Sequence, residues 1–476
     1  MSGSEPESFA TRGIETVIRW LYTFCLACIF PFFLVWFLFQ MVLKNKYRRG
    51  FSQRLGMISV DRNMTGEMRR AIWVHAASVG EVRVAEPVVK GLCDSANDLR
   101  VYVTCITDTG YETAKTVFPN AEGVYQAPFD FPFAVNRYMD ALTPDLLILI
   151  ETEIWPNLIH AADRRRIPVM LVNGRISDTS YPRYRMIRSV LRPTLRKISL
   201  AAMQSERDAR RLVELGANPD KTKVAGNVKY DRNFDLTPSE SLTALYASAG
   251  WTDMTPVLVA GSTHSEDETA LLTAYDILKN RHGMALHMII APRHLERTHE
   301  LTKQLTVRGI SFVRRSEYHG SSGDHIELSD YSEPEQLKEI IVLDVMGELT
   351  GAYGLGIIGC VGGTFQDIGG HNLLEPAAHG IPVLFGPHIQ NCREPARALM
   401  NAGGGFMAED GNALAERIAY LLRDGDVRVS AGRRAREVIS MNRGAVSRNV
   451  DYINQLMNPE SGGAGTVDET WKPEER

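Results

Sequence analysis

Cysteine is scarce in this sequence, which makes a disulfide framework or a cysteine-based metal centre a poor explanation of its stability. The 476 residues contain six cysteines, which are Cys25, Cys28, Cys93, Cys105, Cys360 and Cys392. Cys25 and Cys28 form a C-x-x-C pattern inside a long apolar run, without the second Cys or His pair that a zinc site requires. We therefore expect no metal site and the free thiols of a reducing compartment.

The sequence also lacks a strong excess of charge of either sign. Its net charge is -4 and its pI is near 6.3. A strongly basic composition would favour a nucleic-acid partner, so this composition predicts no nucleic-acid partner, and any anion site has to be built locally. With 44% hydrophobic and 23% charged residues, the chain is long enough for two or three globular domains.

A long run without charged side chains stands near the N-terminus. Residues 20–43 exceed the about 20 residues that cross a bilayer as a helix, and the run is longer than the apolar core of a cleavable signal peptide. The segment after the run is basic, whereas residues 1–19 contain three glutamates. Because an excess of Lys and Arg marks the cytoplasmic side, we expect a polar extension (1–19), a transmembrane helix (20–43) and cytoplasmic domains.

Two series of short apolar runs alternate with helical patterns downstream, which is typical of parallel sheets covered on both faces. The first series comprises 71–75, 100–105, 145–150, 168–173, 199–204 and 223–227. The second comprises 256–261, 286–291, 310–315, 339–344, 356–363 and 381–386. The sequence thus predicts an α/β protein with two doubly wound domains, 44–235 and 236–457, a linker near 231–250, and a disordered tail at 458–476.

One glycine motif is a decoy for a dinucleotide site. Gly354, Gly356 and Gly359 match G-x-G-x-x-G, but they stand at the start of an apolar strand. A pyrophosphate site needs these glycines between a strand and a helix, so we predict no nicotinamide cofactor.

Three other strand ends of the second series favour a nucleotide site. They offer Ser262 or Thr263 as a helix cap, Arg293 with His294, and the turn of Gly369 and Gly370 followed by Glu375. A carboxylate can accept from two ribose hydroxyls while an arginine and backbone amides hold a phosphate. Each element alone has an ordinary explanation, because Arg293 could form a surface ion pair and Glu375 could complement a helix dipole.

The stretch WVHAASVGEV, residues 73–82, raises two alternatives in the first domain. Ser78 could be a nucleophile on a sharp turn, or Glu81 could be a working carboxylate in the first turn of a helix. Glu151 and Glu153 follow another strand at the same predicted edge, where neighbouring carboxylates raise each other's pKa and can act as acid or base. An ordinary helix-start glutamate also explains Glu81.

Eight motifs, in this order, resemble those of the transferases of 3-deoxy-D-manno-octulosonic acid (Kdo) in lipid A biosynthesis. They are HAASVGEV, ETEIWPNL, NGRIS, GNVKYD, AGSTHSEDE, APRHLER, MGEL and GGHNLLEP, and the resemblance spans about residues 45–450. It implies a GT-B glycosyltransferase with two Rossmann-like domains around a central cleft. It further implies transfer of Kdo from CMP-Kdo to a hydroxyl of a tetraacylated lipid A precursor at the inner membrane, with inversion and without metal or cofactor.

The resemblance also assigns roles to particular positions. It implies that Glu81 accepts the proton of the acceptor hydroxyl and that Glu151 and Lys229 stabilise the transition state. The positions that correspond to CMP contacts are Pro292, Arg293, Met346, Gly347, Glu348, Asn372, Leu373, Leu374 and Glu375.

Two other classes of function and one further segment remain open at this point. A serine hydrolase would need Ser78 with His264, His294 or His371, all of which lie in the other predicted domain. A nucleotide-binding adaptor at the membrane would need none of Glu81, Glu151 and Lys229. Residues 180–197 interleave basic with apolar side chains and could either contact anionic lipid or form a solvated basic face.

Overall fold

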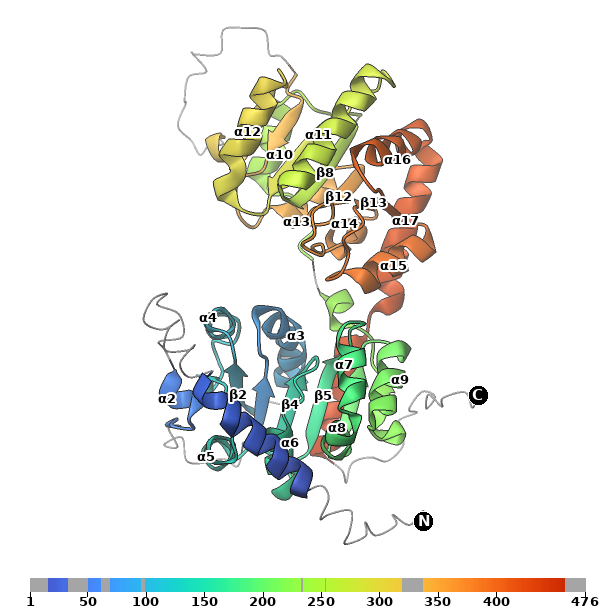
Figure 1. Cartoon of the computed structure of the whole chain (residues 1–476). Coiled ribbons are helices and arrows are strands. Elements are labelled where there is room, and N and C mark those ends of the chain that lie inside the picture. The colour runs from blue at the N-terminus through green and yellow to red at the C-terminus, as the bar shows by residue number, and fades with distance from the viewer. Residues whose placement is uncertain are drawn as a thin grey trace, which may run out of the picture. The chain divides into compact units, whose positions relative to one another are not determined.

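The computed structural model describes residues 16–32, 50–60, 69–95, 99–232, 234–252, 254–318 and 337–458. The chain divides into two compact units (Figure 1). Unit 1 consists of Met1–Arg232 and Arg443–Arg476, and unit 2 consists of Asn233–Asn442. The chain therefore leaves unit 1, builds unit 2 from one continuous segment, and returns.

Unit 1 contains a seven-stranded sheet in the order β3-β2-β1-β4-β5-β6-β7, and all its strand pairs are parallel. The strands are β1 (Arg70–His75), β2 (Leu99–Cys105), β3 (Gly123–Gln126), β4 (Leu146–Ile150), β5 (Val169–Gly174), β6 (Leu200–Met203) and β7 (Thr222–Val224). Every residue of β4 and β5 is buried, because helices cover both faces of the sheet.

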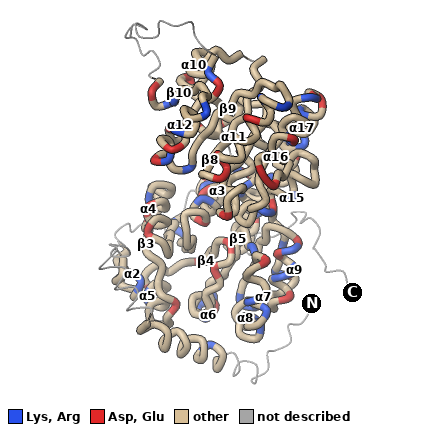
Figure 2. Tube along the Cα trace, turned by 45° about the horizontal axis from the view of Figure 1, so that its top comes forward, with Lys and Arg blue, Asp and Glu red and all other residues tan. Residues whose placement is uncertain are grey.

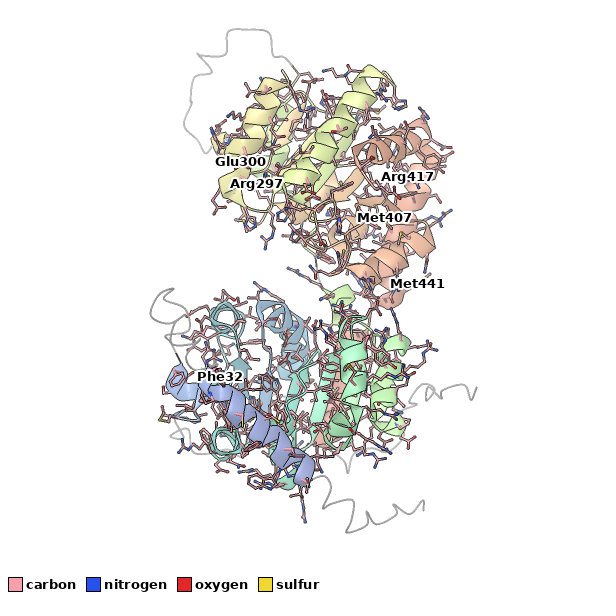
Figure 3. All side chains as sticks on the ribbon, viewed as in Figure 1. Phe32, Arg297, Glu300, Met407, Arg417 and Met441 are labelled. Atoms are coloured by element: carbon pink, nitrogen blue, oxygen red, sulfur yellow. The ribbon has the colours of Figure 1, made fainter. Side chains whose placement is uncertain are left out.

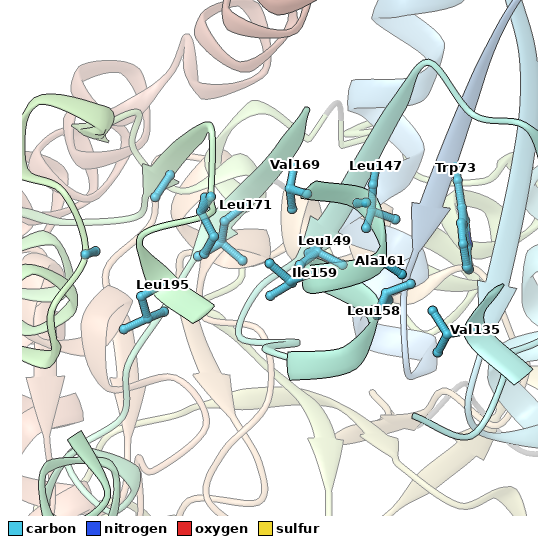
Figure 4. Close-up of a cluster of buried hydrophobic side chains, with 14 of the residues drawn as sticks. Trp73, Val135, Leu147, Leu149, Leu158, Ile159, Ala161, Val169, Leu171 and Leu195 are labelled. Carbon is cyan, nitrogen blue, oxygen red and sulfur yellow. The ribbon is translucent and has the colours of Figure 1, made fainter. Parts of the chain in front are cut away.

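The helices of unit 1 flank this sheet, and most of them bury apolar residues. They are α2 (Phe51–Arg54), α3 (Val79–Ser95), α4 (Asp108–Val117), α5 (Pro132–Leu142), α6 (Pro156–Arg164), α7 (Ser180–Met186), α8 (Arg188–Leu195), α9 (Glu206–Leu215) and α18 (Ala445–Met457), with the 3-10 turns η1 (Pro219–Lys221) and η2 (Val228–Asp231). On one face, Trp73 and Leu149 of the sheet meet Val135, Leu158 and Leu195 of α5, α6 and α8 (Figure 4). A second core on the other face joins the sheet to α3 and α18.

Unit 2 repeats the architecture with the strand order β10-β11-β9-β8-β12-β13-β14, again with parallel pairs. Its strands are β8 (Val257–Thr263), β9 (His287–Pro292), β10 (Phe312–Arg314), β11 (Ile340–Val342), β12 (Ile358–Val361), β13 (Val383–Phe385) and β14 (Gly405–Met407). Its helices are α10 (Glu240–Ser248), α11 (Ser265–Asn280), α12 (Thr298–Val307), α13 (Leu349–Ala352), α14 (Leu374–Ala378), α15 (Arg393–Ala402), α16 (Gly411–Arg423) and α17 (Gly425–Asn442), with η3 (Leu295–Arg297), η4 (Arg315–Glu317) and η5 (Tyr353–Leu355).

Each sheet reverses its strand order beside its first strand. In unit 1, β1 lies between β2 and β4, and in unit 2, β8 lies between β9 and β12. Ligands of open parallel sheets bind at the carboxyl ends of the strands beside such a reversal. The residues after β1 and β4, and those after β8, β9 and β12, therefore stand where binding sites are expected.

The predicted α/β class with two doubly wound domains is confirmed, and all twelve predicted strands are present. The decoy motif also lies where predicted, because Gly356 precedes β12 and Gly359 lies within it. The prediction missed β3 and β14, which are short strands at the sheet edges.

The predicted domain boundary is wrong at two places. Residues 443–457 belong to unit 1, where Val450 and Ile453 of α18 pack in the core beside α3. Apolar periodicity identifies the buried face of a helix but not the sheet that this face covers. The predicted linker is also too long, because Leu242 and Leu245 of α10 are buried in the core of unit 2.

The predicted transmembrane run is described only in its first part. Residues 16–32 form a helix, whereas residues 33–43 lie outside the described residues. The helix lies along unit 1 (dark blue in Figure 1), where the Tyr22 hydroxyl donates to Asp130 Oδ2 at 3.0 Å and the Phe30 ring meets the Phe131 ring edge-on. None of the helices in the described parts of the chain combines the length and the apolar character that a membrane crossing needs.

Candidate functional site

Glu81 is held by the turn that joins β1 to α3. The backbone N–H of Ala77 donates to Glu81 Oε2 at 2.7 Å, and the Ser78 hydroxyl donates to Oε1 at 3.1 Å. Both carboxylate oxygens are therefore fixed by the turn that precedes the helix, and the side chain is half-buried. Ser78 serves the carboxylate as a hydrogen-bond donor, which is the role of a turn residue.

Glu81 stands in the field of two further carboxylates that follow β4. Burial, together with the negative charges of Glu153 and Glu151, raises the pKa of Glu81 to about 8, and the hydrogen bonds from Ala77 and Ser78 limit this rise. A carboxyl group with such a pKa changes its protonation state near neutral pH, as a general base or acid must. The glutamates that follow β1 and β4 therefore lie close enough to affect each other's pKa, as the sequence predicts.

Glu153 has a different environment and remains ionised more easily than Glu81. Burial alone would raise its pKa, but His75 and the Trp155 N–H lower the pKa of Glu153 below its usual range. Trp155 Nε1 donates to Glu153 Oε2 at 2.7 Å, and His75 Nε2 lies 3.7 Å from the same oxygen. The two environments push the pKa values of Glu81 and Glu153 apart, which suits one group for proton exchange and the other for a fixed charge.

Glu151 is the first residue after β4 and has an unusual backbone conformation. Its φ is +57°, a left-handed value that costs energy in a residue other than glycine. Its carboxylate Oε1 lies 3.9 Å from Lys229 Nζ. The turn thus places Glu151 near a lysine of η2, and the structure brings Glu81, Glu151, Glu153 and Lys229 into one electrostatic group.

Two asparagines that the sequence reasoning missed position Lys229. Asn173 Oδ1 accepts from the backbone N–H of Val228 at 3.0 Å, and Asn227 Oδ1 accepts from that of Lys229 at 3.1 Å. Asn173 itself has a φ of +56° at the end of β5. The motifs NGRIS and GNVKYD each contain one of these residues, but no spacing rule connects positions 173 and 227.

In unit 2, Arg293 follows β9 and remains available to a ligand. Its backbone N–H donates to Thr263 O at 2.9 Å, which fixes the loop, while its side chain is exposed. In the described part of unit 2, no carboxylate forms an ion pair with the Arg293 guanidinium group. The alternative that Arg293 serves only in a surface ion pair therefore has no support among these residues. Pro292 is the last residue of β9.

The expected helix cap at Ser262 or Thr263 is wrong. Strand β8 continues through Thr263, and His264 is the N-cap of α11. Asp267, in the first turn of α11, accepts from the backbone N–H groups of His264 and of residues 363–365 at 2.7–3.2 Å. This carboxylate therefore ties the start of α11 to the loop after β12, a connection that sequence spacing could not reveal.

The remaining positions of the predicted nucleotide site fall into two loops of unit 2. Gly347, with a φ of +93°, and the exposed Met346 precede Glu348, whose carboxylate receives both Nε and Nη2 of Arg315 at 3.0 and 2.9 Å. Asn372 donates to Glu375 Oε1 at 3.0 Å and caps Leu374 N–H at 3.1 Å. Leu373 and Leu374 are buried side chains, so they can offer a ligand only backbone groups.

The hydrolase alternative loses its support in this arrangement. Ser78 donates to a carboxylate, and His264, His294 and His371 lie in unit 2, where His264 and His371 contact each other. Among the described residues, no group of three or more His, Cys, Asp or Glu side chains could hold a metal ion.

Comparison with known proteins gives a consistent result. A family model described as "3-Deoxy-D-manno-octulosonic-acid transferase (kdotransferase)" matches residues 49–232. A 3-deoxy-D-manno-octulosonic acid transferase of Haemophilus influenzae is 33% identical over 443 residues, which cover 92% of this chain and 99% of that protein. One of Bordetella pertussis is 31% identical over 393 residues, which cover 81% of this chain and 87% of that protein.

The fold agrees with that of a solved glycosyltransferase. The structure of a glycosyltransferase from Rickettsia africae matches with a TM-score of 0.54 at 14% identity and covers 83% of this chain and 99% of that one. Such a low identity shows a likeness of fold alone, so the relationship rests on the two transferase sequences, which cover 92% and 81% of this chain. The chain belongs to the family of 3-deoxy-D-manno-octulosonic acid transferases and is a glycosyltransferase.

Proposed function

We propose that this protein transfers Kdo from CMP-Kdo to a hydroxyl group of a tetraacylated lipid A precursor, with inversion and with Glu81 as general base. The observation that carries the proposal is the carboxylate of Glu81, whose two oxygens are held by Ala77 and Ser78 and whose pKa lies near 8 because it is buried beside two further glutamates. A sugar hydroxyl is a poor nucleophile, and a carboxylate with a raised pKa is a strong enough base to accept its proton as the new bond forms.

Glu151 and Lys229 support this step through their charges. An oxygen nucleophile attacks the anomeric carbon while the bond to the phosphate lengthens, so positive charge develops on the sugar and negative charge on the phosphate. The carboxylate of Glu151 suits the former, and the ammonium group of Lys229 suits an anionic group of the substrate. Their separation of 3.9 Å leaves the lysine only loosely paired and able to turn to a ligand.

The donor nucleotide belongs, in this proposal, to the loops of unit 2. Arg293 would bind phosphate, Glu375 would accept from ribose hydroxyls, and backbone groups of Gly347, Leu373 and Leu374 would approach the base and sugar. Glu348 is already ordered by two hydrogen bonds from Arg315, so binding does not have to immobilise that carboxylate. We also infer the GT-B manner of action, in which one α/β domain serves the acceptor and the other the donor.

Membrane attachment is the second part of the proposal, with the catalytic units on the cytoplasmic side of the inner membrane and residues 20–43 as the anchor. The helix of residues 16–32 supports attachment, because Trp20, Leu21, Phe24, Ile29 and Phe32 are 56–78% exposed along it (Figure 3 labels Phe32). Large apolar side chains exposed in one stripe mark a protein or lipid contact.

Basic side chains also lie on helices α7 and α8 of the same unit. Helix α8 buries Leu191 and Leu195 in the core of unit 1, whereas the arginines at 183, 185, 188, 192 and 196, on α7, on α8 and directly after α8, are exposed. Figure 2 marks the Lys and Arg positions along these helices in blue. Helix α8 and the N-terminal helix line one crevice, with Arg19 on one side and Val190 and Pro193 on the other. We propose that these arginines contact anionic headgroups, since polybasic segments gain about 1 kcal/mol for each Lys or Arg near an anionic surface.

A direct assay tests the proposed reaction. The full-length chain in detergent is mixed with freshly prepared CMP-Kdo and the tetraacylated precursor. The mass of the lipid product is measured by mass spectrometry, and the release of CMP is followed in parallel. A product heavier by one or more Kdo residues is expected. Hydrolysis of CMP-Kdo without a heavier lipid, or no turnover at all, would contradict the proposal.

Flotation with vesicles tests the attachment separately. Vesicles that contain anionic lipid should carry the wild type to the top of a density gradient. The triple variant Arg185→Ser, Arg188→Ser, Arg192→Ser should float less well at low salt, and the matched variant Arg207→Ser, Arg210→Ser, which alters the neighbouring helix α9, should not. Equal flotation of all three proteins would remove the lipid role of α7 and α8.

A further inference from the structure

His264 and His371 form a direct hydrogen-bonded pair in unit 2. Their Nε2 atoms are 3.0 Å apart, and the two rings are nearly parallel, at 7°. His264 is the N-cap of α11 and only 8% exposed, whereas His371 ends the loop after β12 and is half-buried. Gly363, with a φ of +68°, makes room for this contact, because a Cβ there would stand 2.9 Å from the His371 ring.

The pair stands at the reversal of strand order in unit 2. His264 follows β8 directly, His371 follows the loop after β12, and Arg293 with His294 follows β9. Because β9, β8 and β12 are neighbours in the sheet, their carboxyl ends bring these side chains to one edge. The His294 ring meets His264 edge-on at 5.6 Å. This edge is where doubly wound sheets bind their ligands.

The charged groups around the pair favour an anion. Arg293, His294 and Arg297 face it from the β9 side, and each of them lowers the pKa of His264. Asp267 of α11 is the carboxylate that opposes this effect, but its oxygens already accept from backbone N–H groups of His264 and the loop after β12. Arg297 is neutralised by Glu268 and Glu300 (Figure 3), which leaves Arg293 as the exposed cation beside the rings.

Burial and the surrounding cations favour the neutral form of both rings. Burial, with His264 and Arg293, lowers the pKa of His371 to about 4, and burial also lowers the pKa of His264. In a neutral pair joined through Nε2, one ring donates and the other accepts, so one Nδ1 carries no proton. The pair can accept one proton on this Nδ1 and keep the hydrogen bond between the two Nε2 atoms. A second added proton would place a hydrogen on both Nε2 atoms and break that bond.

We propose that His264 and His371, together with Arg293, bind the phosphate group of the nucleotide donor, and that the pair takes up one proton as the phosphate gains its second negative charge. This inference rests on the proposed CMP-Kdo donor and assigns two further residues to its site.

The step balances in atoms and charge. The bond between the anomeric carbon and the phosphate oxygen breaks, its electron pair stays on that oxygen, and a phosphodiester with one charge becomes a monoester with two. The acceptor oxygen forms the new bond to carbon and gives its proton to Glu81. The histidine pair takes up its proton from an acid of the bulk solvent, and Glu81 later returns the proton of the acceptor hydroxyl to the solvent. The negative charge of a dianion beside the rings favours an imidazolium.

Calorimetry with CMP tests the inference on the full-length protein. At about pH 8 free CMP is a dianion, since the second pKa of a phosphate monoester is about 6. Binding is measured in two buffers of different ionisation enthalpy, which gives the number of protons taken up. For the wild type, uptake of between about half and one proton per CMP is expected, because the neutral pair has a single vacant Nδ1.

Two variants separate the pair from an ordinary surface histidine. His371→Asn should bind CMP about tenfold more weakly and lose the proton uptake, since a charge-assisted bond is lost. His282→Asn changes a histidine that pairs with Glu416 on the same unit and should leave both quantities unchanged. Binding of cytidine, which lacks the phosphate, should be the same in all three proteins and shows that His371→Asn is folded.

The outcomes distinguish this inference from the proposed function. Tight CMP binding by the wild type without proton uptake, or unchanged binding by His371→Asn, would overturn the role of the pair and leave the Kdo transfer standing. Failure of the wild type both to bind CMP and to turn over CMP-Kdo would overturn the proposed function, and the inference with it.

Discussion

Lys229 Nζ lies 3.9 Å from Glu151 Oε1, although 77 residues separate them in the chain. The lysine is carried by η2, which Asn173 and Asn227 anchor through its backbone, and the glutamate is carried by a strained turn after β4. Their side chains are 45% and 24% exposed, so an ion pair of this kind adds at most about 1 kcal/mol to stability. The left-handed backbone of Glu151 costs energy, and the ion pair adds little stability in return, so we infer that the pair serves function.

We predict that Lys229→Met lowers the turnover of CMP-Kdo by about 10²-fold or more, because removing one charge that stabilises a transition state typically has this effect. The melting temperature should change by no more than a few degrees. Lys221→Met, which removes an exposed lysine of η1 in the same unit, is the control and should keep full turnover. Near-normal activity of Lys229→Met would refute the assignment.

Glu81→Gln should reduce turnover by about 10²-fold or more, as expected for a lost general base. The wild-type rate should rise with pH and level off above about pH 8, because Glu81 must be ionised to accept a proton and its pKa lies near 8. The amide oxygen can still accept from the Ala77 N–H, whereas the amide NH2 group would have to donate to the Ser78 hydroxyl oxygen. Ser78→Ala removes only that second partner, so it is the control and should alter the rate far less. A pH-independent wild-type rate between pH 6 and 9 would contradict this role.

The same variant should be more stable than the wild type in alkaline solution. The folded-state pKa of Glu81, about 8, lies above its unfolded value of about 4.3, so stability from this group is present at low pH and is lost as the pH rises through 8. Glu81→Gln removes this loss. Its melting temperature should exceed that of the wild type by a few degrees near pH 9 and should differ little near pH 5.

Part of this site was predictable from sequence because strand ends of one parallel sheet share an edge. The runs 145–150 and 71–75 are apolar except for Asp145 and His75 at their ends, so they identify buried strands, and the carboxylates that follow them had to meet. Strands β3 and β14 escaped detection because they are short edge strands with partly exposed residues, which weakens the pattern that marks a buried strand.

Other parts of the site depend on contacts that no local pattern encodes. Asp267 accepts from residues 96 to 98 positions away, and His264 meets His371 across 107 positions. Likewise, the return of α18 to unit 1 depends on which apolar surface remains uncovered after both sheets have formed. Sequence patterns identify the faces of elements, but the packing partner is a property of the folded chain.

Asp267 ties the start of α11 to the loop after β12, and its loss should be costly. It is 1% exposed and receives four backbone N–H groups, so Asp267→Ala would leave these donors without partners and cost about 3–5 kcal/mol. Thermal unfolding should show the loss in unit 2. Asp276→Ala is the control, because this exposed carboxylate of α11 only pairs with Arg308 at the surface. Equal destabilisation by both variants would show that the four bonds contribute little.

The contact between Tyr22 and Asp130 predicts how firmly the N-terminal helix is held to unit 1. Asp130 is 4% exposed, and its oxygens accept from the backbone N–H groups of Asn157 and Leu158 as well as from the Tyr22 hydroxyl. Tyr22→Phe removes one donor from a buried carboxylate, which should weaken the docking by about 1–3 kcal/mol. Hydrogen exchange of residues 16–32 in detergent should become faster to the same extent.

The docking should also depend on pH in a definite direction. Burial raises the pKa of Asp130 to about 7, above its unfolded value of about 3.9, so stability from this group is lost as the pH rises through 7. Tyr22→Phe removes a hydrogen bond that favours the ionised form of Asp130, so the pKa of Asp130 should rise further. The loss of stability should then extend to higher pH in this variant. Trp20→Ser alters the exposed side of the same helix and should leave exchange unchanged while weakening vesicle binding. If Tyr22→Phe and Trp20→Ser had the opposite effects, the exposed stripe would be the docked face and Tyr22 the lipid-facing one.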